Sequence, residues 1–98
     1  MKNNVLNIID SELKGKWLLR EYINDVLFWA GFKEVNGWRK VGDVYIATYM
    51  KDRFTNVSVL NLTLKRDEYS YFKIINVKLD NIKKEGWYPL LFLYLSRY

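Results

Sequence analysis

FKEVNGWRKVGDVYIATYMKDRFTNVSVLNLTLK, which spans residues 32–65, is rich in β-branched and aromatic residues and is interrupted by Gly, Asp and Asn. Alternating apolar and polar residues indicate strands with one buried face, and Gly, Asn and Asp mark the turns between them. The pattern predicts strands at residues 44–50 and 57–65, joined by a turn at residues 52–56. This segment therefore predicts an antiparallel sheet.

Asn36-Gly37 leaves two interpretations open for the residues that precede these strands. An Asn-Gly pair between apolar stretches is the strongest short signal for a type I′ hairpin, which would pair FKEV with WRKV. Alternatively, residues 32–40 form one bulged strand, and the chain turns at Gly42-Asp43. Both interpretations place this region in the sheet.

Residues 11–30 are predicted to form a helix, because their apolar residues recur at helical spacing. Ser11 suits the N-cap of this helix, and Gly31 suits its C-terminal stop. Gly15 weakens the first turn, so the firm helix is expected to begin just after it. Residues 5–9 are expected to add a short helical turn before it.

The rest of the chain continues the sheet and then leaves it. Residues 66–68 turn the chain into a further strand at residues 69–79, and Asp80 suits the cap of a short turn. Pro89 fits the first turn of a helix, so we expect a C-terminal helix or extended segment. The predicted fold class for residues 1–98 is α+β: a single domain whose N-terminal helix packs on an antiparallel sheet of three to five strands.

The predicted strands carry more apolar residues than one buried face needs. Alternation predicts that one set of apolar residues lies on the face covered by the N-terminal helix: Leu60, Leu62, Leu64, Ile75, Val77, Leu79, Val44, Ile46 and Met50. It assigns to the opposite face Val57, Val59, Phe72, Ile74, Tyr45 and Tyr49. Three explanations fit the second apolar face: a C-terminal segment folded back over it, an exposed aromatic platform for stacked bases, or a homodimer that pairs an edge strand or buries an interface of Val57, Val59, Phe72 and Ile74.

The chain contains no His, no Cys and no Gln. The usual acid/base group at physiological pH, the thiol nucleophile and the common soft metal ligands are therefore missing. A restriction-type nuclease with Asp43 as metal ligand needs an acidic residue two positions before Lys51, where Tyr49 stands. We therefore expect no enzyme activity and no catalytic, cofactor-binding or metal-binding residues. A metal-dependent nuclease is the least favoured alternative.

Sixteen Lys and Arg against eleven Asp and Glu give the chain a net charge of +5. The basic residues gather at predicted strand ends and turns, where they are either solvated surface charges or a phosphate-binding rim. The second interpretation predicts a nucleic-acid-binding surface with Tyr45 and Tyr49 as stacking groups and with a rim of Arg39, Lys40, Lys51, Arg53, Lys65, Arg66, Lys83 and Lys84.

The first ten residues, MKNNVLNIID, lack the long apolar region and the small-residue cleavage site of a signal peptide. The longest apolar run, residues 90–95, is far shorter than a membrane-spanning segment. We therefore expect an intracellular protein that makes no contact with membranes.

The composition adds a resemblance to the features above. With its single Pro, its missing His, Cys and Gln, and its many Ile, Leu, Lys, Asn and Tyr, the chain resembles small proteins encoded by filamentous or rod-shaped viruses of hyperthermophilic archaea. The resemblance implies a thermostable α+β protein, often dimeric, that acts by binding in the host cytoplasm, as DNA-binding regulators and inhibitors of host defence do. We therefore expect a homodimeric binding module with an unidentified protein partner, and nucleic-acid binding as the alternative.

Overall fold

The structure, a computed structural model, describes residues 4–83 of the chain. The predicted C-terminal helix or extended segment and the candidate rim residue Lys84 lie outside the described residues. Within residues 4–83, no helix is long and apolar enough to cross a membrane.

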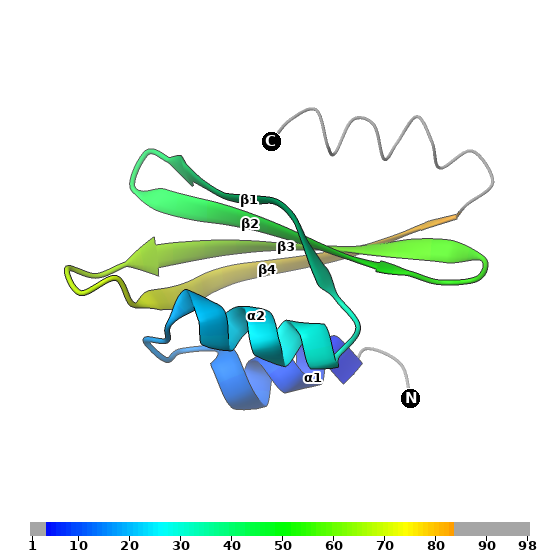
Figure 1. Ribbon diagram of the computed structural model, residues 1–98, viewed down its shortest axis with the longest axis horizontal. Helices are drawn as coiled ribbons and strands as arrows, with labels where there is room; N and C mark the ends of the chain where they lie inside the picture. Colours follow the sequence, from blue (N-terminus) through cyan, green and yellow to red (C-terminus); the bar gives the residue numbers. More distant parts are fainter. Residues whose placement is uncertain (1–3, 84–98) are drawn as a thin grey trace.

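An antiparallel sheet of four strands in the order β1-β2-β3-β4 forms one layer, and helices cover one of its faces (Figure 1). This arrangement confirms the predicted α+β fold with N-terminal helical segments packed on an antiparallel sheet. The elements in chain order are α1 (Asn4–Ile8), the π-helix η1 (Ile9–Leu13), α2 (Arg20–Trp29), β1 (Lys33–Val41), β2 (Val44–Asp52), β3 (Asn56–Arg66) and β4 (Phe72–Lys83).

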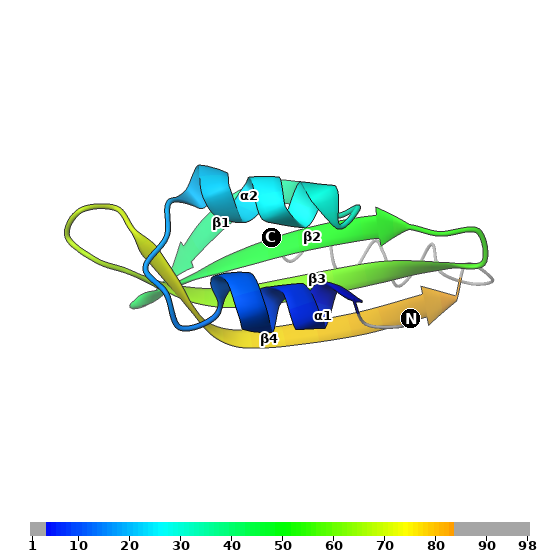
Figure 2. The ribbon, with the colours of Figure 1, turned by 90° about the horizontal axis from the view of Figure 1, so that it is seen from below.

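The N-terminal helical region is broken into two pieces, where one helix over residues 11–30 was expected. Gly15 adopts a left-handed φ of 79°, and the backbone of Leu18 exchanges hydrogen bonds of 2.8 and 2.7 Å with Phe72 at the start of β4. Ser11 is therefore no N-cap: it lies inside η1, and its hydroxyl donates to the carbonyl of Ile8 at 3.4 Å. The break lets α1 and η1 lie over β3 and β4 while α2 lies over β1 and β2 (Figure 2).

β1 is one bulged strand, so the alternative interpretation of Asn36-Gly37 is confirmed and the hairpin at that position is wrong. Val35 pairs with Thr48 and Trp38 with Ala47, so Asn36 and Gly37 are inserted in the ladder with φ of 62° and 68°. A hairpin there would end each strand after a few residues, whereas the bulged strand pairs with β2 along nearly its whole length. The chain turns instead after Val41, at Gly42-Asp43.

The register of β2 exchanges the two faces that alternation had assigned to it. Tyr45 pairs with Leu64, Ala47 with Leu62 and Tyr49 with Leu60, so these β2 side chains share the helix-covered face. The predicted placement of Val44, Ile46 and Met50 on that face is therefore wrong. The reason is that alternation divides a strand into two sets of residues but does not say which set meets which set of its neighbour.

β4 contains a second irregularity, which moves Phe72 and Ile74 to the helix-covered face. Leu64 pairs with Ile74, but Thr63 pairs with Asn76, so Ile75 is an extra residue and is 43% exposed. Beyond this bulge, Val77 and Leu79 lie on the helix side as predicted. β4 continues to Lys83, so Asp80 is not a turn cap but pairs with Val59 inside the strand.

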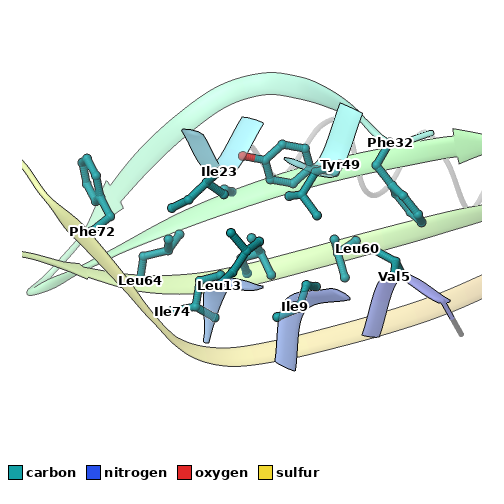
Figure 3. Close-up of a cluster of buried hydrophobic side chains, with 13 residues drawn as sticks. Val5, Ile9, Leu13, Ile23, Phe32, Tyr49, Leu60, Leu64, Phe72 and Ile74 are labelled. Carbon is teal, nitrogen blue, oxygen red and sulfur yellow. The ribbon is translucent and has the colours of Figure 1, made fainter. Parts of the chain in front are cut away.

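Among residues 4–83, apolar side chains form two clusters, one on each face of the sheet. The larger lies between the helices and the sheet, where Tyr49, Leu60 and Leu64 meet side chains from α1, η1 and α2 (Figure 3). The smaller consists of Val57, Val59 and Ile82, with Met50 packed against them. The predicted interface residues Phe72 and Ile74 belong to the first cluster and Val57 and Val59 to the second. All four are buried within the single chain, so they do not form one exposed surface.

Replacement of Gly37 by Val tests the bulge. A β-branched residue at a φ of 68° is strained, so we expect Gly37→Val to lower the free energy of unfolding by about 1–2 kcal/mol. Urea unfolding measures this loss. Lys40→Val, at an exposed position of the same strand, is the control and is expected to leave stability within about 0.5 kcal/mol. Equal stability of the two variants contradicts the bulge.

Candidate functional sites

A chain of polar side chains joins α2 to the sheet. Arg20 donates from Nη2 to Glu34 Oε2 at 2.6 Å, and Asn24 donates from Nδ2 to Glu34 Oε1 at 3.0 Å. The Tyr49 hydroxyl donates to Asn24 Oδ1 at 2.5 Å and accepts from Trp38 Nε1 at 2.9 Å. The Arg20 guanidinium also lies 4.8 Å from the centre of the Trp38 ring. These five side chains, called the α2 network below, connect the helix to β1 and β2.

The chemistry of Tyr49 identifies the α2 network as an anchor for the helix. Tyr49 is only 1% exposed, and this burial raises the pKa of its phenol above the ordinary value. The phenol therefore stays protonated at neutral pH and uses its proton to bond Asn24. Both oxygens of Glu34 and the Asn24 amide are likewise engaged. The network thus holds α2 in position and leaves no ionised phenol to act as a base.

A cleft of about 230 Å³ opens beside this network. It is smaller than the pockets of roughly 300–1,000 Å³ that hold drug-sized ligands. Its lining residues are Asn24, Asp25, Phe28, Phe32, Lys33, Glu34 and Tyr49. Because Asn24, Glu34 and Tyr49 of its lining are already bonded to one another, the cleft suits a single inserted side chain better than a small-molecule substrate.

The outer side of α2 and the segment before it expose large apolar side chains. Trp29 is 86% exposed, and the Phe28 ring lies 6.4 Å from it in an edge-on arrangement. Exposed single apolar residues are common, but a concentration of aromatic residues on one short segment is typical of interaction sites. Trp17, before the helix, lies instead beside β4, with Lys73 Nζ 5.6 Å from the centre of its ring. We call the exposed aromatic residues of the helix itself the aromatic surface of α2; its members are Tyr22, Phe28 and Trp29.

The structure divides the predicted basic rim between the two ends of the sheet. Arg39, Lys40, Lys65 and Arg66 lie at the end that holds the β1–β2 and β3–β4 turns, whereas Lys51, Arg53 and Lys83 lie at the β2–β3 end. Lys51 Nζ donates to the Ala30 carbonyl at 3.1 Å, and Arg53 Nε donates to Ser58 Oγ at 3.0 Å. Arg66 Nη2 donates to Ser70 Oγ at 2.6 Å. The rim is therefore not continuous, and Lys51, Arg53 and Arg66 serve local contacts.

The predicted stacking groups do not form an exposed platform, although Tyr45 is only half-buried. Tyr49 is buried in the α2 network, and Tyr45 packs its ring edge-on against Phe72 with the ring centres 5.3 Å apart. Both side chains face the helices because of the β2 register. The predicted aromatic platform on the opposite face is therefore absent from the described part of the sheet.

The sheet face opposite the helices has one basic half. Near the β1–β2 and β3–β4 turns, cross-strand rows bring Arg39 beside Ile46, Thr63 and Asn76, and Asn61 beside Lys78. Lys65 and Lys73 form a pair in the next row. We call this surface the basic half of the opposite face; its polar members are Arg39, Asn61, Thr63, Lys65, Lys73, Asn76 and Lys78.

The other half of that face is apolar and holds a groove of about 520 Å³. It is lined by Gly31, Lys33, Val35, Met50, Asp52 and Val57. Within residues 4–83, no group of three or more acidic side chains comes together that could hold a metal ion.

Comparison with known proteins adds no further site to these surfaces. No family model matches this chain, and neither a curated protein nor a solved structure is similar enough to count as a match. The resemblance to small viral proteins of hyperthermophilic archaea and the intracellular location therefore stay predictions.

Sequence reasoning missed the α2 network and the aromatic surface of α2. One signal was present for the network, because Arg20 and Asn24 stand four positions apart and so share a helix face. The partner strand positions of Glu34, Trp38 and Tyr49 depend on the bulge and the β2 register, which alternation alone does not fix.

Replacement of Tyr49 by Phe tests the network through its pH dependence. The phenol pKa is raised in the fold, so its stabilising effect is complete below the unfolded value of about 10 and is lost as the pH rises above it, by about 1.4 kcal/mol per pH unit. We expect Tyr49→Phe to cost about 1–3 kcal/mol at neutral pH, because Trp38 and Asn24 lose a partner. Urea unfolding at about pH 8 and pH 11 measures both effects. An alkaline loss of stability as steep in the variant as in the wild type contradicts this assignment.

Proposed function

We propose that this protein is a non-enzymatic binding module that recognises another protein through the aromatic surface of α2. The observation that carries the proposal is the exposure of Trp29 and Phe28 next to each other at the end of the helix. Trp and Tyr are the residues that most often dominate the binding energy of protein interfaces. Keeping Trp29 exposed in a small domain also lowers its solubility, which favours a role for it in recognition.

Rigid presentation supports the same proposal. The α2 network fixes Arg20 and Asn24 to Glu34 and Tyr49 of the sheet, so the helix cannot slide or rotate without breaking several bonds. A surface held in its binding conformation loses less entropy when a partner docks. The network therefore gives the exposed aromatic residues a fixed geometry.

The charges beside the aromatic surface define the chemistry of the partner. Glu21 and Asp25 are exposed on α2 next to Tyr22, Phe28 and Trp29, in a chain whose net charge is +5. Lys33 lines the cleft beside Phe28, and Lys51 bonds the Ala30 carbonyl at the end of the helix, so the acidic border runs along the helix and not around its end. An aromatic surface with an acidic border along one side is complementary to an apolar pocket that carries Lys or Arg on one side. The proposed partner is a protein with such a pocket.

The lack of an enzyme site is a further part of the proposal. Two observations support this part. The sequence contains no His and no Cys, and Asn24, Glu34 and Tyr49 beside the cleft are bonded to one another. The Tyr49 phenol, whose pKa is raised by burial, is protonated and bonded at neutral pH. This chemistry suits recognition better than catalysis.

Selection from a random-peptide library tests the aromatic surface while the partner is unidentified. Peptides selected on the wild-type protein are expected to share apolar residues flanked by Lys or Arg. Their affinity, measured by calorimetry, is expected to fall by about 2 kcal/mol or more, roughly 30-fold, for Trp29→Ala.

Phe54→Ala is the matched control for Trp29→Ala. Phe54 is also an exposed aromatic residue, at 94%, but it lies in the β2–β3 turn and not on α2. The control is expected to bind the peptides as the wild type does. Selected peptides without a common pattern, or with equal affinity for both variants, contradict the proposal.

Nucleic-acid binding is the second candidate function, and the basic half of the opposite face favours it. Arg39, Lys65, Lys73 and Lys78 share one sheet face with Asn61, Thr63 and Asn76. Basic side chains that neutralise phosphates release counterions, and amide and hydroxyl groups can bond phosphate or sugar oxygens. With Tyr45 and Tyr49 turned inward, this surface would contact the backbone and not stack bases.

Fluorescence anisotropy with labelled single- and double-stranded DNA and RNA, at low and near-physiological salt, tests this second candidate. We expect Lys65→Glu to weaken binding and to reduce the slope of log K against log salt by about one. Lys40→Glu makes the same charge change on the helix-covered side of the sheet and is expected to have the smaller effect. Absence of binding at low salt excludes the candidate.

A further inference from the structure

The two edges of the sheet differ in how open they are to a further strand. The outer edge of β1 is interrupted in its middle by the Asn36-Gly37 bulge, a feature that prevents strand addition. The outer edge of β4 is bridged by Leu18 at Phe72 and is interrupted at Ile75. From residue 76 to residue 83, however, no described segment pairs with that edge. Its backbone groups there form a template for another strand.

We propose that a second copy of this chain occupies the open edge, so that residues 76–82 of β4 pair with the same residues of the partner in an antiparallel ladder centred on Leu79. The two four-stranded sheets then form one continuous sheet. The two-fold axis runs perpendicular to the sheet, which keeps the helices of both copies on the same face.

The distribution of charge along β4 selects this register. A two-fold axis perpendicular to the sheet pairs only residues that share a face, and Lys78 and Asp80 both lie on the face opposite the helices. Centring the ladder on Leu79 places each Lys78 opposite an Asp80, so opposite charges meet twice. Centring it on Lys78 or on Asp80 instead places like charges opposite each other. Only the proposed register is therefore electrostatically self-complementary among these three.

The neighbouring residues are compatible with that register. Leu79 meets Leu79 of the second copy on the helix-covered face, where it packs beside the main apolar cluster. α1 lies along β3 and β4 (Figure 2), so the α1 helices of the two copies flank the new ladder. Continuity of sheet and helix layers is the arrangement by which edge pairing extends a two-layer domain.

This dimer uses the β4 side of the molecule, whereas the aromatic surface lies on α2 over β1 and β2 (Figure 2). The inference is therefore independent of the proposed protein-binding function. Each copy of the dimer would keep its aromatic surface exposed, so the dimer would present that surface twice. A partner that carries two matching pockets would gain avidity from this arrangement.

Charge reversal on β4 tests the register. Sedimentation equilibrium of the full chain over a range of concentrations is expected to show a monomer–dimer equilibrium. In the Lys78→Asp variant, the new Asp of each copy faces Asp80 of the other copy, so two pairs of carboxylates repel each other. We expect the dimer dissociation constant to rise on the order of tenfold to a hundredfold. Asp80→Lys is expected to raise the dissociation constant to a similar extent, because the new Lys of each copy then faces Lys78 of the other copy. The double variant Lys78→Asp/Asp80→Lys restores opposite charges and is expected to dimerise as the wild type does.

The controls separate edge pairing from loss of folding and from other contacts. Lys65→Asp makes the same charge change on the inner strand β3 and is expected to leave dimerisation unchanged. Thermal unfolding of every variant identifies any that is misfolded, and recovery by the double variant shows that both positions tolerate the exchanged residues. A wild-type protein that stays monomeric overturns the proposal. So does a dimer that survives the single reversals, or one that Trp29→Ala disrupts and Lys78→Asp does not.

Discussion

The buried hydroxyl of Tyr49 is the constraint on which the rest of the structure depends. A phenol with almost no exposed surface must find hydrogen-bond partners, since an unpaired one costs about 1–3 kcal/mol. Its partners are Trp38 on β1 and Asn24 on α2. The Asn36-Gly37 bulge lies directly before Trp38 in the β1 ladder, and the break at Gly15 precedes the helix that carries Asn24. The bulge and the break, both departures from regular structure, thus each come before one of the two residues that bond the Tyr49 hydroxyl.

The same constraint explains why the aromatic residues of α2 point away from the core. Ile23 and Leu27 are buried against the sheet, and Arg20 and Asn24 are committed to Glu34 and Tyr49. The remaining side of the helix carries Tyr22, Phe28 and Trp29, which have no place in the core. A helix anchored through polar bonds on one side and aromatic on the other is well suited to rigid recognition.

Three candidate interaction surfaces are present, and two of them share Lys78. The aromatic surface of α2 lies over β1 and β2, the basic half lies on the opposite face of the sheet, and the open edge lies along β4. Their chemistries differ as well. The surface of α2 is aromatic with acidic neighbours, the basic half carries Lys, Arg and polar side chains, and the β4 edge offers backbone groups beside Lys78 and Asp80. Substitutions at Trp29 disturb the aromatic surface alone, whereas substitutions at Lys78 change both the basic half and the β4 edge.

The sequence by itself determined the elements and their order: strands at residues 44–50 and 57–65, a helix stop at Gly31 and an antiparallel α+β fold. These follow from local propensity and alternation, which act over a few residues. Tertiary structure alone decided the facing of Tyr45, Tyr49, Phe72 and Ile74, because facing depends on the register against a neighbouring strand and on bulges that shift it. It also decided that Asn36-Gly37 is a bulge and not a hairpin, because a long ladder with β2 offers more bonds than two short strands. The α2 network depends on both decisions, so only the packed chain could bring its five side chains together.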